Sequence, residues 1–190
     1  HVNRILVHQG LQRIRAGQAH PGLLALLTVA GREPQRTSAA DLGFAAGPRL
    51  NAAGRLDDMS LGIECLLADD PVQAGALAQQ LDLLNRDRRL IEEQMKQEAL
   101  AALSQLDTEE GSDRPALCLF CQDWHEGLVG LVASRVKDRI HRPVIAFAPA
   151  DRNPDELKGS ARSIPGIHIR DVLADLATRQ PQLIRRYGGH

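Results

Sequence analysis

The stretch Asp70-Pro71-Val72-Gln73 begins a run of 37 residues, DPVQAGALAQQLDLLNRDRRLIEEQMKQEALAALSQL (70–106), whose local signals predict the longest element of the chain. An aspartate at the N-cap, a proline at the first helical position and a glutamine at the capping-box position together predict a helix start. Apolar residues then follow at heptad spacing, namely Leu77, Leu81, Leu84, Ile91 and Met95, with Arg88 in the seam between them. The run predicts one connector helix about 54 Å long, at about 1.5 Å rise per residue.

The residues before this run read as a set of short helices. Pro21-Gly22 begins an apolar segment that continues to residue 30. Thr37 or Ser38 is predicted to cap a third helix that runs toward Ala46. Gly47-Pro48 is predicted to end it, because proline disfavours helical backbone at the residue before it.

The pattern changes after residue 111. Residues 116–120 predict a buried strand, 127–140 a helix and 144–148 a second strand, which is a βαβ unit with parallel strands. Residues 158–164 predict a further strand and 169–178 a further helix. The fold class is therefore α/β, with a domain boundary within about residues 105–113.

Composition indicates a cytosolic protein without a membrane segment. Of the 190 residues 43% are apolar and 25% charged, and no apolar run approaches the length that spans a bilayer. Net charge is −1, but residues 112–190 hold twelve Lys and Arg against nine Asp and Glu, a mildly basic balance that suits an anionic ligand. Aromatic residues make up 3% of the chain, which argues against binding bases mainly by stacking. His1 at the first position predicts a piece of a longer chain.

Two short stretches combine arginines with small neighbours, Gly47-Pro48-Arg49-Leu50-Asn51-Ala52-Ala53-Gly54-Arg55 and Lys158-Gly159-Ser160-Ala161-Arg162-Ser163. A planar guanidinium grips phosphate oxygens in a bidentate fork, and small neighbours let a sugar-phosphate chain approach. On a strand, the Ser160 hydroxyl and the Arg162 guanidinium would share one face. In the first stretch no simple helical face holds Arg49, Asn51 and Arg55 together, but a turn could converge them. The two stretches together suggest a phosphate-rich polymer as ligand.

Each stretch also has a purely structural interpretation. Arg49 and Arg55 could pair with nearby acidic residues, namely Asp57, Asp58 or Glu64. The Lys and Arg of the second stretch could simply keep an edge strand soluble. Trp124-His125-Glu126-Gly127 ends a strand and begins a helix, and its histidine could be a ligand or bond the backbone.

The sequence shows no complete active site. No DHH, DxD or HExxH motif and no P-loop pattern occurs. Cys118 and Cys121 form a CxxC pair, but no second pair completes a zinc site, so we interpret them as small apolar residues.

Taken together and in order, these segments closely resemble the RecJ family of bacterial single-strand-specific 5'-to-3' DNA exonucleases, within the DHH phosphoesterase superfamily. The residues that carry the resemblance are Asp41-Leu42-Gly43-Phe44, residues 47–58, Trp124-His125-Glu126-Gly127, residues 141–147, residues 158–160, residues 162–164 and Gly188-Gly189-His190. The resemblance covers nearly the whole chain. One departure is Ala161, where we expect glycine.

The resemblance implies the end of a DHH domain at residues 1–70, a connector helix at 71–108 and an incomplete DHH-associated domain with a mixed sheet at 112–190. It implies that Mn²⁺ or Mg²⁺ is held by residues upstream of this segment, which itself supplies no metal ligand. It implies that a repair and recombination nuclease of the bacterial cytoplasm acts on single-stranded DNA with a 5' end. Its implied protein partners are a single-strand-binding protein and a recombination helicase.

The resemblance also implies roles for individual residues. Arg55 would face a phosphate near the metals, supported by Arg49 and Asn51. Ser160 and Arg162 would bind the 5'-terminal phosphate, with Lys158 beside them. His190, with Gly188 and Gly189, would contact the substrate phosphate, and Arg55 and His190 would stabilise the charge that develops in the reaction.

Two other functions remain open at this point. The chain could belong to another DHH phosphoesterase, such as an oligoribonuclease or nucleotide phosphatase. It could also be a non-catalytic nucleic-acid-binding module.

Overall fold

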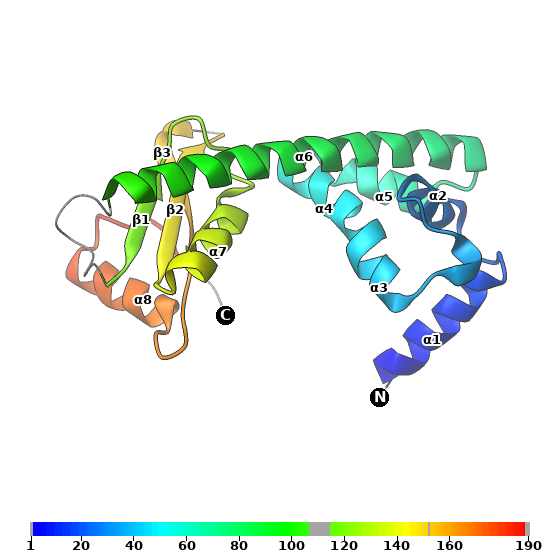
Figure 1. Cartoon of the computed structure of the whole chain (residues 1–190), viewed down its shortest axis with the longest axis horizontal. Coiled ribbons are helices and arrows are strands. Elements are labelled where there is room, and N and C mark those ends of the chain that lie inside the picture. The colour runs from blue at the N-terminus through cyan, green and yellow to red at the C-terminus, as the bar shows by residue number, and fades with distance from the viewer. Residues whose placement is uncertain (1, 107–114, 152, 189–190) are drawn as a thin grey trace. The chain divides into compact units, whose positions relative to one another are not determined.

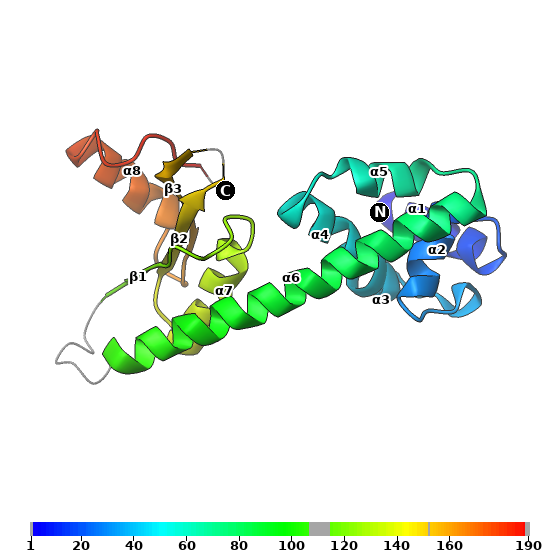
Figure 2. The same cartoon turned by 90° about the horizontal axis from the view of Figure 1, so that it is seen from above.

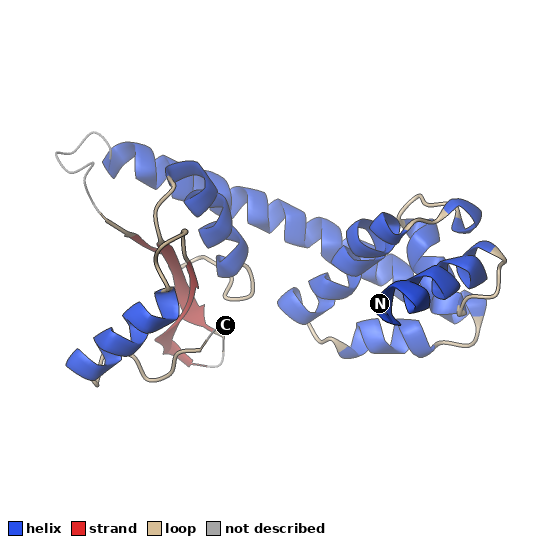
Figure 3. Cartoon of the chain, turned by 90° about the horizontal axis from the view of Figure 1, so that it is seen from below, coloured by secondary structure: helices blue, strands red, loops and turns tan. Residues whose placement is uncertain are grey.

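The computed structural model of the chain describes residues 2–106, 115–151 and 153–188, and the chain divides into two compact units, His1–Leu90 and Ile91–His190. In the described residues the strands, drawn red in Figure 3, are confined to the second unit. The elements of the first unit are α1 (Val2–Arg15), α2 (Pro21–Val29), η1 (Pro34–Arg36), α3 (Ala39–Asp41), η2 (Leu42–Ala46), α4 (Gly47–Leu56), α5 (Ser60–Leu67) and the first part of α6 (Pro71–Leu106). The second unit contains the rest of α6, β1 (Leu117–Phe120), α7 (Val129–Ile140), β2 (Val144–Ala150), β3 (Asn153–Arg162) and α8 (Ile169–Arg179).

The long helix α6, green in Figure 1, forms over the predicted residues. Asp70 caps it, since the Gln73 backbone N–H donates to the Asp70 carboxylate at 3.0 Å. The buried side of α6 includes Leu81 and Met95, as predicted, and the smaller residues Ala74, Ala78, Asn85 and Ala99. Ala78 and Asn85 lie one position after the predicted Leu77 and Leu84, which are only partly buried. Small side chains allow close helix packing, which the leucine pattern alone did not reveal. In the described part of the chain, no helix is both long enough and apolar enough to cross a membrane.

The two compact units divide between Leu90 and Ile91, inside α6. The domain boundary within about residues 105–113 stays a prediction. The part of α6 that begins at Ile91 packs against other elements of the second unit, and this packing agrees with the position of the division. The buried Trp124 side chain donates its indole N–H to Glu98 of α6 at 2.8 Å, and Arg135 of α7 lies 3.7 Å from Glu92. The predicted family domains at 1–70, 71–108 and 112–190 stay predictions.

The first unit has a core of small and branched side chains contributed by α2, η2, α4, α5 and α6. Its buried members are Leu26, Ala46, Ala53, Cys65, Ala78 and Leu81. Gly22 allows α2 to approach α5, because a Cβ at this position would lie 1.7 Å from the Cys65 carbonyl oxygen. Burial raises the pKa of the Cys65 thiol. Cys65 is fully buried and is a core residue.

The segment from Ser38 to Leu56 corrects one prediction. Ser38 caps α3 as expected, but the helix does not end at Gly47-Pro48. It continues through a π-helical segment, η2, in which the Gly47 N–H donates to the carbonyl of Leu42, five residues back. Proline has no N–H to donate and is tolerated in the first turn of a helix, so Pro48 sits at the start of α4 after this wider turn.

The second unit is built on a three-stranded mixed sheet in the order β1-β2-β3, as the fold class predicted. β1 and β2 are parallel, which confirms the βαβ unit, and β3 is antiparallel to β2. Helix α7 packs on one face of the sheet through its buried residues, Val129, Val132, Ala133 and Val136. Figure 2 draws α8 on the opposite side of the sheet from α7. The prediction of a buried strand holds for one face of β1 only, because Leu117 and Leu119 are buried whereas Cys118 and Phe120 are exposed.

Candidate nucleic-acid interface

The stretch Gly47–Leu56 is a helix rather than a turn, and this separates its polar side chains. Arg49 turns inward, where its guanidinium makes two contacts with the Asp82 carboxylate of α6, from Nε at 2.9 Å and from Nη2 at 2.6 Å. It also donates to the Ala45 carbonyl at 2.7 Å. The two side chains are only 12% and 9% exposed. Arg49 therefore joins α4 to α6, and its contribution to a phosphate site would be indirect.

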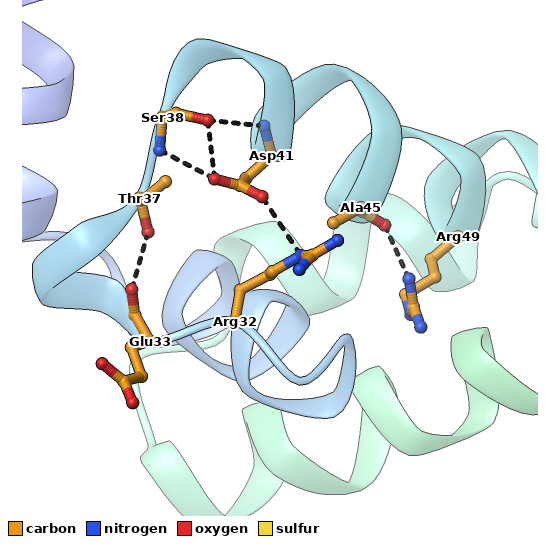
Figure 4. A network of polar contacts seen from close by, with 7 residues as sticks. All are labelled: Arg32, Glu33, Thr37, Ser38, Asp41, Ala45 and Arg49. Carbon is orange, nitrogen blue, oxygen red and sulfur yellow. Dashed lines mark hydrogen bonds and ion pairs between the residues drawn. The ribbon is translucent and has the colours of Figure 1, made fainter.

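A capped turn at the start of α3 precedes η2 and α4 along the chain (Figure 4). The Asp41 carboxylate accepts hydrogen bonds from the Ser38 hydroxyl at 2.7 Å and the Ser38 N–H at 2.9 Å, and Arg32 lies 3.1 Å from it. The Ser38 hydroxyl is the main reason that the pKa of Asp41 lies below its ordinary value, followed by the Ser38 N–H. The charged form of Asp41 thus stabilises the helix start.

Asn51 and Arg55 lie on the other face of α4. Their spacing of four residues places them one turn apart on the same side, and Asn51 is exposed. Arg55 is partly buried, yet within the described residues no hydrogen bond or ion pair engages its guanidinium. The alternative interpretation, in which Arg55 pairs with Asp57, Asp58 or Glu64, does not hold among the described residues; Asp58 instead accepts hydrogen bonds from the Ser60 N–H and hydroxyl. The Arg55 guanidinium remains available to an anion.

Ser160 and Arg162 share one face of β3, as the strand prediction requires. Their cross-strand partners are Ala146 and Val144, two buried residues on the side of the sheet that α7 covers. Arg162 donates from Nη1 to the Ser160 hydroxyl at 3.0 Å and to the Ala161 carbonyl at 2.8 Å. Both side chains are partly buried, and among the described residues no carboxylate pairs with Arg162.

The first turn of α7 lies against this pair. A Cβ added to Gly130 would be 2.9 Å from both the Arg162 Nη2 atom and the Ser160 hydroxyl oxygen. No described residue accepts a hydrogen bond from the backbone N–H of Val129 or Gly130. Helix N-termini with such free N–H groups favour anions. The pair and the helix start thus bring several donors to one place.

His125 does not point to a ligand role in this structure. Its Nδ1 accepts a hydrogen bond from the Gly127 N–H at 3.0 Å. This is the second of the two roles predicted for His125, a hydrogen bond to the backbone.

Lys158 forms an ion pair with Glu126, which follows His125 in the turn before α7. The Lys158 ammonium lies 2.5 Å from the Glu126 carboxylate, which also accepts the Asp151 N–H at 2.9 Å. Burial raises the pKa of Glu126, but the hydrogen bonds from Lys158 and Asp151 outweigh it, so the net pKa lies below the ordinary value. Lys158 shares its strand face with Ser160 and remains 59% exposed, so it offers a second cation whose charge Glu126 offsets.

The remaining predicted site residues lie at the end of the chain. His190 and Gly189 fall outside the described residues. Gly188 is exposed, with no neighbouring atom within 4 Å of an added Cβ. Their contribution to the site stays a prediction.

Two acidic residues that shape these sites were missed by sequence reasoning. Asp82 of α6 is 33 positions from its partner Arg49, and no local pattern indicates that separation. Glu126 was noticed as part of a motif but not as the partner of Lys158. The signal available in the sequence was that Asp82 is an acidic residue among the apolar positions of α6, where an acidic side chain needs a partner.

Comparison with known proteins identifies the relatives of the chain. Residues 113–190 match the DHHA1 domain family. The single-stranded-DNA-specific exonuclease RecJ of Dickeya dadantii is 55% identical, and that of Escherichia coli 52% identical, each over 99% of this chain. Over its whole length the chain is similar to a part of RecJ exonucleases. The crystal structure of RecJ from Thermus thermophilus in complex with Mg²⁺ superimposes with a TM-score of 0.78 at 32% identity, over 99% of this chain and 27% of that one.

The RecJ relationship concerns a part of those proteins. The chain spans 32% of the length of the Dickeya and Escherichia proteins, about a third. A RecJ structure bound to manganese, with a TM-score of 0.76, is covered to 43%. The residues that carried the resemblance in the sequence lie mainly on α3, η2, α4, β2 and β3 and in the turn before α7.

Proposed function

We propose that the chain supplies substrate-phosphate contacts to a RecJ-type exonuclease that degrades single-stranded DNA from the 5' end, in repair and recombination. One observation carries the proposal: the partly buried Arg162 guanidinium bonds the Ser160 hydroxyl beside free N–H groups of α7 and lacks a described carboxylate partner. A partly buried cation without a counter-charge is unfavourable unless an anion joins it. The names of the relatives supply the substrate class.

Ser160 and Arg162 would hold the 5'-terminal phosphate. Two donors from β3 and the backbone N–H groups of Val129 and Gly130 are of the type that a terminal phosphate accepts. A terminal phosphate carries more charge and more free oxygens than an internal phosphodiester. The site would therefore favour chain ends, which is what a directional exonuclease needs.

Arg55 and Asn51 would form a second, separate phosphate contact on α4. A guanidinium fixed on a helix can stabilise charge that develops on a phosphodiester as it is cleaved. We assign Arg55 this electrostatic role and propose the same for His190, with Gly188 and Gly189 allowing close approach. Arg49 would support Arg55 by holding α4 against α6 through Asp82.

The described residues of this chain do not fit a divalent metal site. Among them no group of three or more His, Cys, Asp or Glu side chains is close enough to hold an ion. RecJ structures have been solved with Mg²⁺ and with Mn²⁺. We propose that the complete protein uses such an ion on ligands outside this segment, and we assign no step of the reaction to a metal held by these residues.

The remaining expectations follow from the same relationship. A nuclease that acts on bacterial DNA would work in the cytoplasm. A single-strand-binding protein and a recombination helicase stay our predicted protein partners. The other DHH phosphoesterases and the non-catalytic module are less well supported, because the matching relatives are named as RecJ exonucleases over the whole chain.

The experiment compares 5'-phosphorylated with 5'-hydroxyl single-stranded oligonucleotides, binding to the 190-residue chain by fluorescence anisotropy at low and moderate salt. We expect the phosphorylated strand to bind about tenfold or more tightly, since a hydrogen-bonded charge pair is lost with the phosphate. Arg162→Ala should abolish this preference. Equal affinity for both strands in the wild-type chain would refute the end-binding role and leave a nonspecific basic surface.

A further inference from the structure

Gly130 occupies the second position of α7, where the backbone does not require glycine. Its φ is not positive, unlike that of Gly17, Gly31 and Gly166. Glycine is also among the least favourable residues inside a helix, because it loses the most backbone freedom on folding. The local structure of α7 therefore favours alanine at this position. A reason for glycine must come from what lies beside it.

The neighbours of Gly130 are the two side chains of the proposed phosphate site. A Cβ would lie 2.9 Å from Arg162 Nη2, 2.9 Å from Ser160 Oγ and 3.5 Å from Ser160 Cβ. Carbon atoms do not approach these polar atoms so closely without displacement. Because Nη2 is the end of a long flexible side chain, the guanidinium would move first.

We infer that Gly130 is a specificity-determining residue, which keeps the space open in which Arg162 and Ser160 are held together for a terminal phosphate. This inference rests on the proposed function. A methyl group at position 130 would push the guanidinium away from the Ser160 hydroxyl and narrow the approach to the free N–H groups of Val129 and Gly130. The fold would tolerate the added methyl group, but the preference for a 5' phosphate would be lost.

This separation between fold and binding makes the inference testable. Gly130→Ala removes a helix-unfavourable glycine, so the thermal midpoint should not fall, whereas the discrimination between 5'-phosphate and 5'-hydroxyl strands should drop about tenfold. The matched control is Gly75→Ala in α6, where an added Cβ meets no atom within 4 Å. That variant should keep full discrimination. Trp124, the single tryptophan and a buried residue, reports folding of the second unit through its emission.

A double variant tests whether Gly130 acts through Arg162. If it does, Gly130→Ala added to Arg162→Ala should cause no further loss, because the guanidinium it would displace is already gone. Additive losses would overturn the inference that Gly130 acts by positioning Arg162. Full discrimination in Gly130→Ala would overturn it as well, while leaving the proposed function intact. If the wild-type chain itself does not discriminate, the proposed function fails and the inference fails with it.

A second measurement needs no variant and covers the case in which Gly130→Ala does not fold. The amide resonance of Gly130 in the wild-type chain should shift on titration with the phosphorylated strand and stay in place with the hydroxyl strand. A resonance that is unmoved by a phosphorylated strand that binds would place the phosphate elsewhere and overturn the inference.

Discussion

Asp82 offers the sharpest test of the energetics of this structure. Its carboxylate binds two arginines of different exposure, Arg49 at 12% and Arg86 at 69%, and is itself 9% exposed. Replacing Asp82 by alanine leaves the Arg49 guanidinium buried with only the Ala45 carbonyl as acceptor. Removing one partner of a buried ion pair costs about 3–5 kcal/mol. We expect about 3 kcal/mol, the lower end, because the Ala45 hydrogen bond remains.

The matched control is Arg86→Ala, which removes the exposed partner of the same carboxylate. An exposed ion pair contributes about 0–1 kcal/mol, so this variant should unfold close to the wild-type chain. The double variant Arg49→Met with Asp82→Leu replaces the pair by apolar side chains. It should recover most of the loss caused by Asp82→Ala, because it no longer leaves a buried charge unpaired.

Urea unfolding of the 190-residue chain measures these differences. For an m-value of about 1.5 kcal/mol/M, a loss of 3 kcal/mol lowers the midpoint by about 2 M. Far-UV circular dichroism follows the helices of both units, most of which belong to the first, and emission from Trp124 follows the second unit alone. The Asp82→Ala shift should appear mainly in the first signal. Equal midpoints for Asp82→Ala and Arg86→Ala would refute the assignment of Arg49 to a buried structural pair.

Three further predictions concern single residues. Glu126→Gln should release Lys158, tighten single-stranded DNA binding for both end types, and steepen the slope of log affinity against log salt by about 0.7, one phosphate contact; an unchanged slope would show that Lys158 does not reach DNA. Glu98→Ala should lower the stability of the second unit by about 1–3 kcal/mol by leaving the Trp124 indole N–H without its acceptor, as measured by the urea midpoint of Trp124 emission, whereas Glu98→Gln should retain most of it. The pKa of Asp41 is lowered in the folded state, so the contribution of this carboxylate to stability is complete above the ordinary aspartate pKa of about 3.9 and is lost as the pH falls through the folded-state pKa. Asp41→Asn should therefore flatten the fall of unfolding free energy at acid pH. An unchanged fall would contradict the role of the Asp41 hydrogen bonds.

The regular elements of this chain were largely predictable, because local signals in the sequence specify them. The Asp70 cap and the uninterrupted stretch after it predicted α6, and the alternation of apolar runs predicted the βαβ unit. The fate of Pro48 was not predictable in the same way. The preferences of proline predict that a helix ends before Pro48, whereas a π-helical turn lets the helix continue past it. That turn contains Ala45 and Ala46, which are buried in the core, and such packing is not specified by a local sequence signal.

The candidate site was predictable in its residue types but not in their partners. Ser160 and Arg162 follow from strand alternation, which fixes their common face. That Arg49 is held by Asp82 follows from the packing of α4 on α6, a contact between distant residues that the sequence does not encode locally. The same limit hid Gly130, because its position gave no hint that it lies against β3.

The environment of each arginine separates structural from binding roles more clearly than its motif does. Arg49 and Arg55 stand in one nine-residue stretch, yet one is neutralised by Asp82 and the other has no acidic partner among the described residues. Arg162 matches Arg55 in this respect. A guanidinium already paired with a carboxylate would have to break that pair to bind a phosphate, whereas an unpaired one gains a counter-charge. We therefore expect Arg55→Ala and Arg162→Ala to weaken DNA binding without lowering the free energy of unfolding. The main effect of Arg49→Ala should be a lower free energy of unfolding.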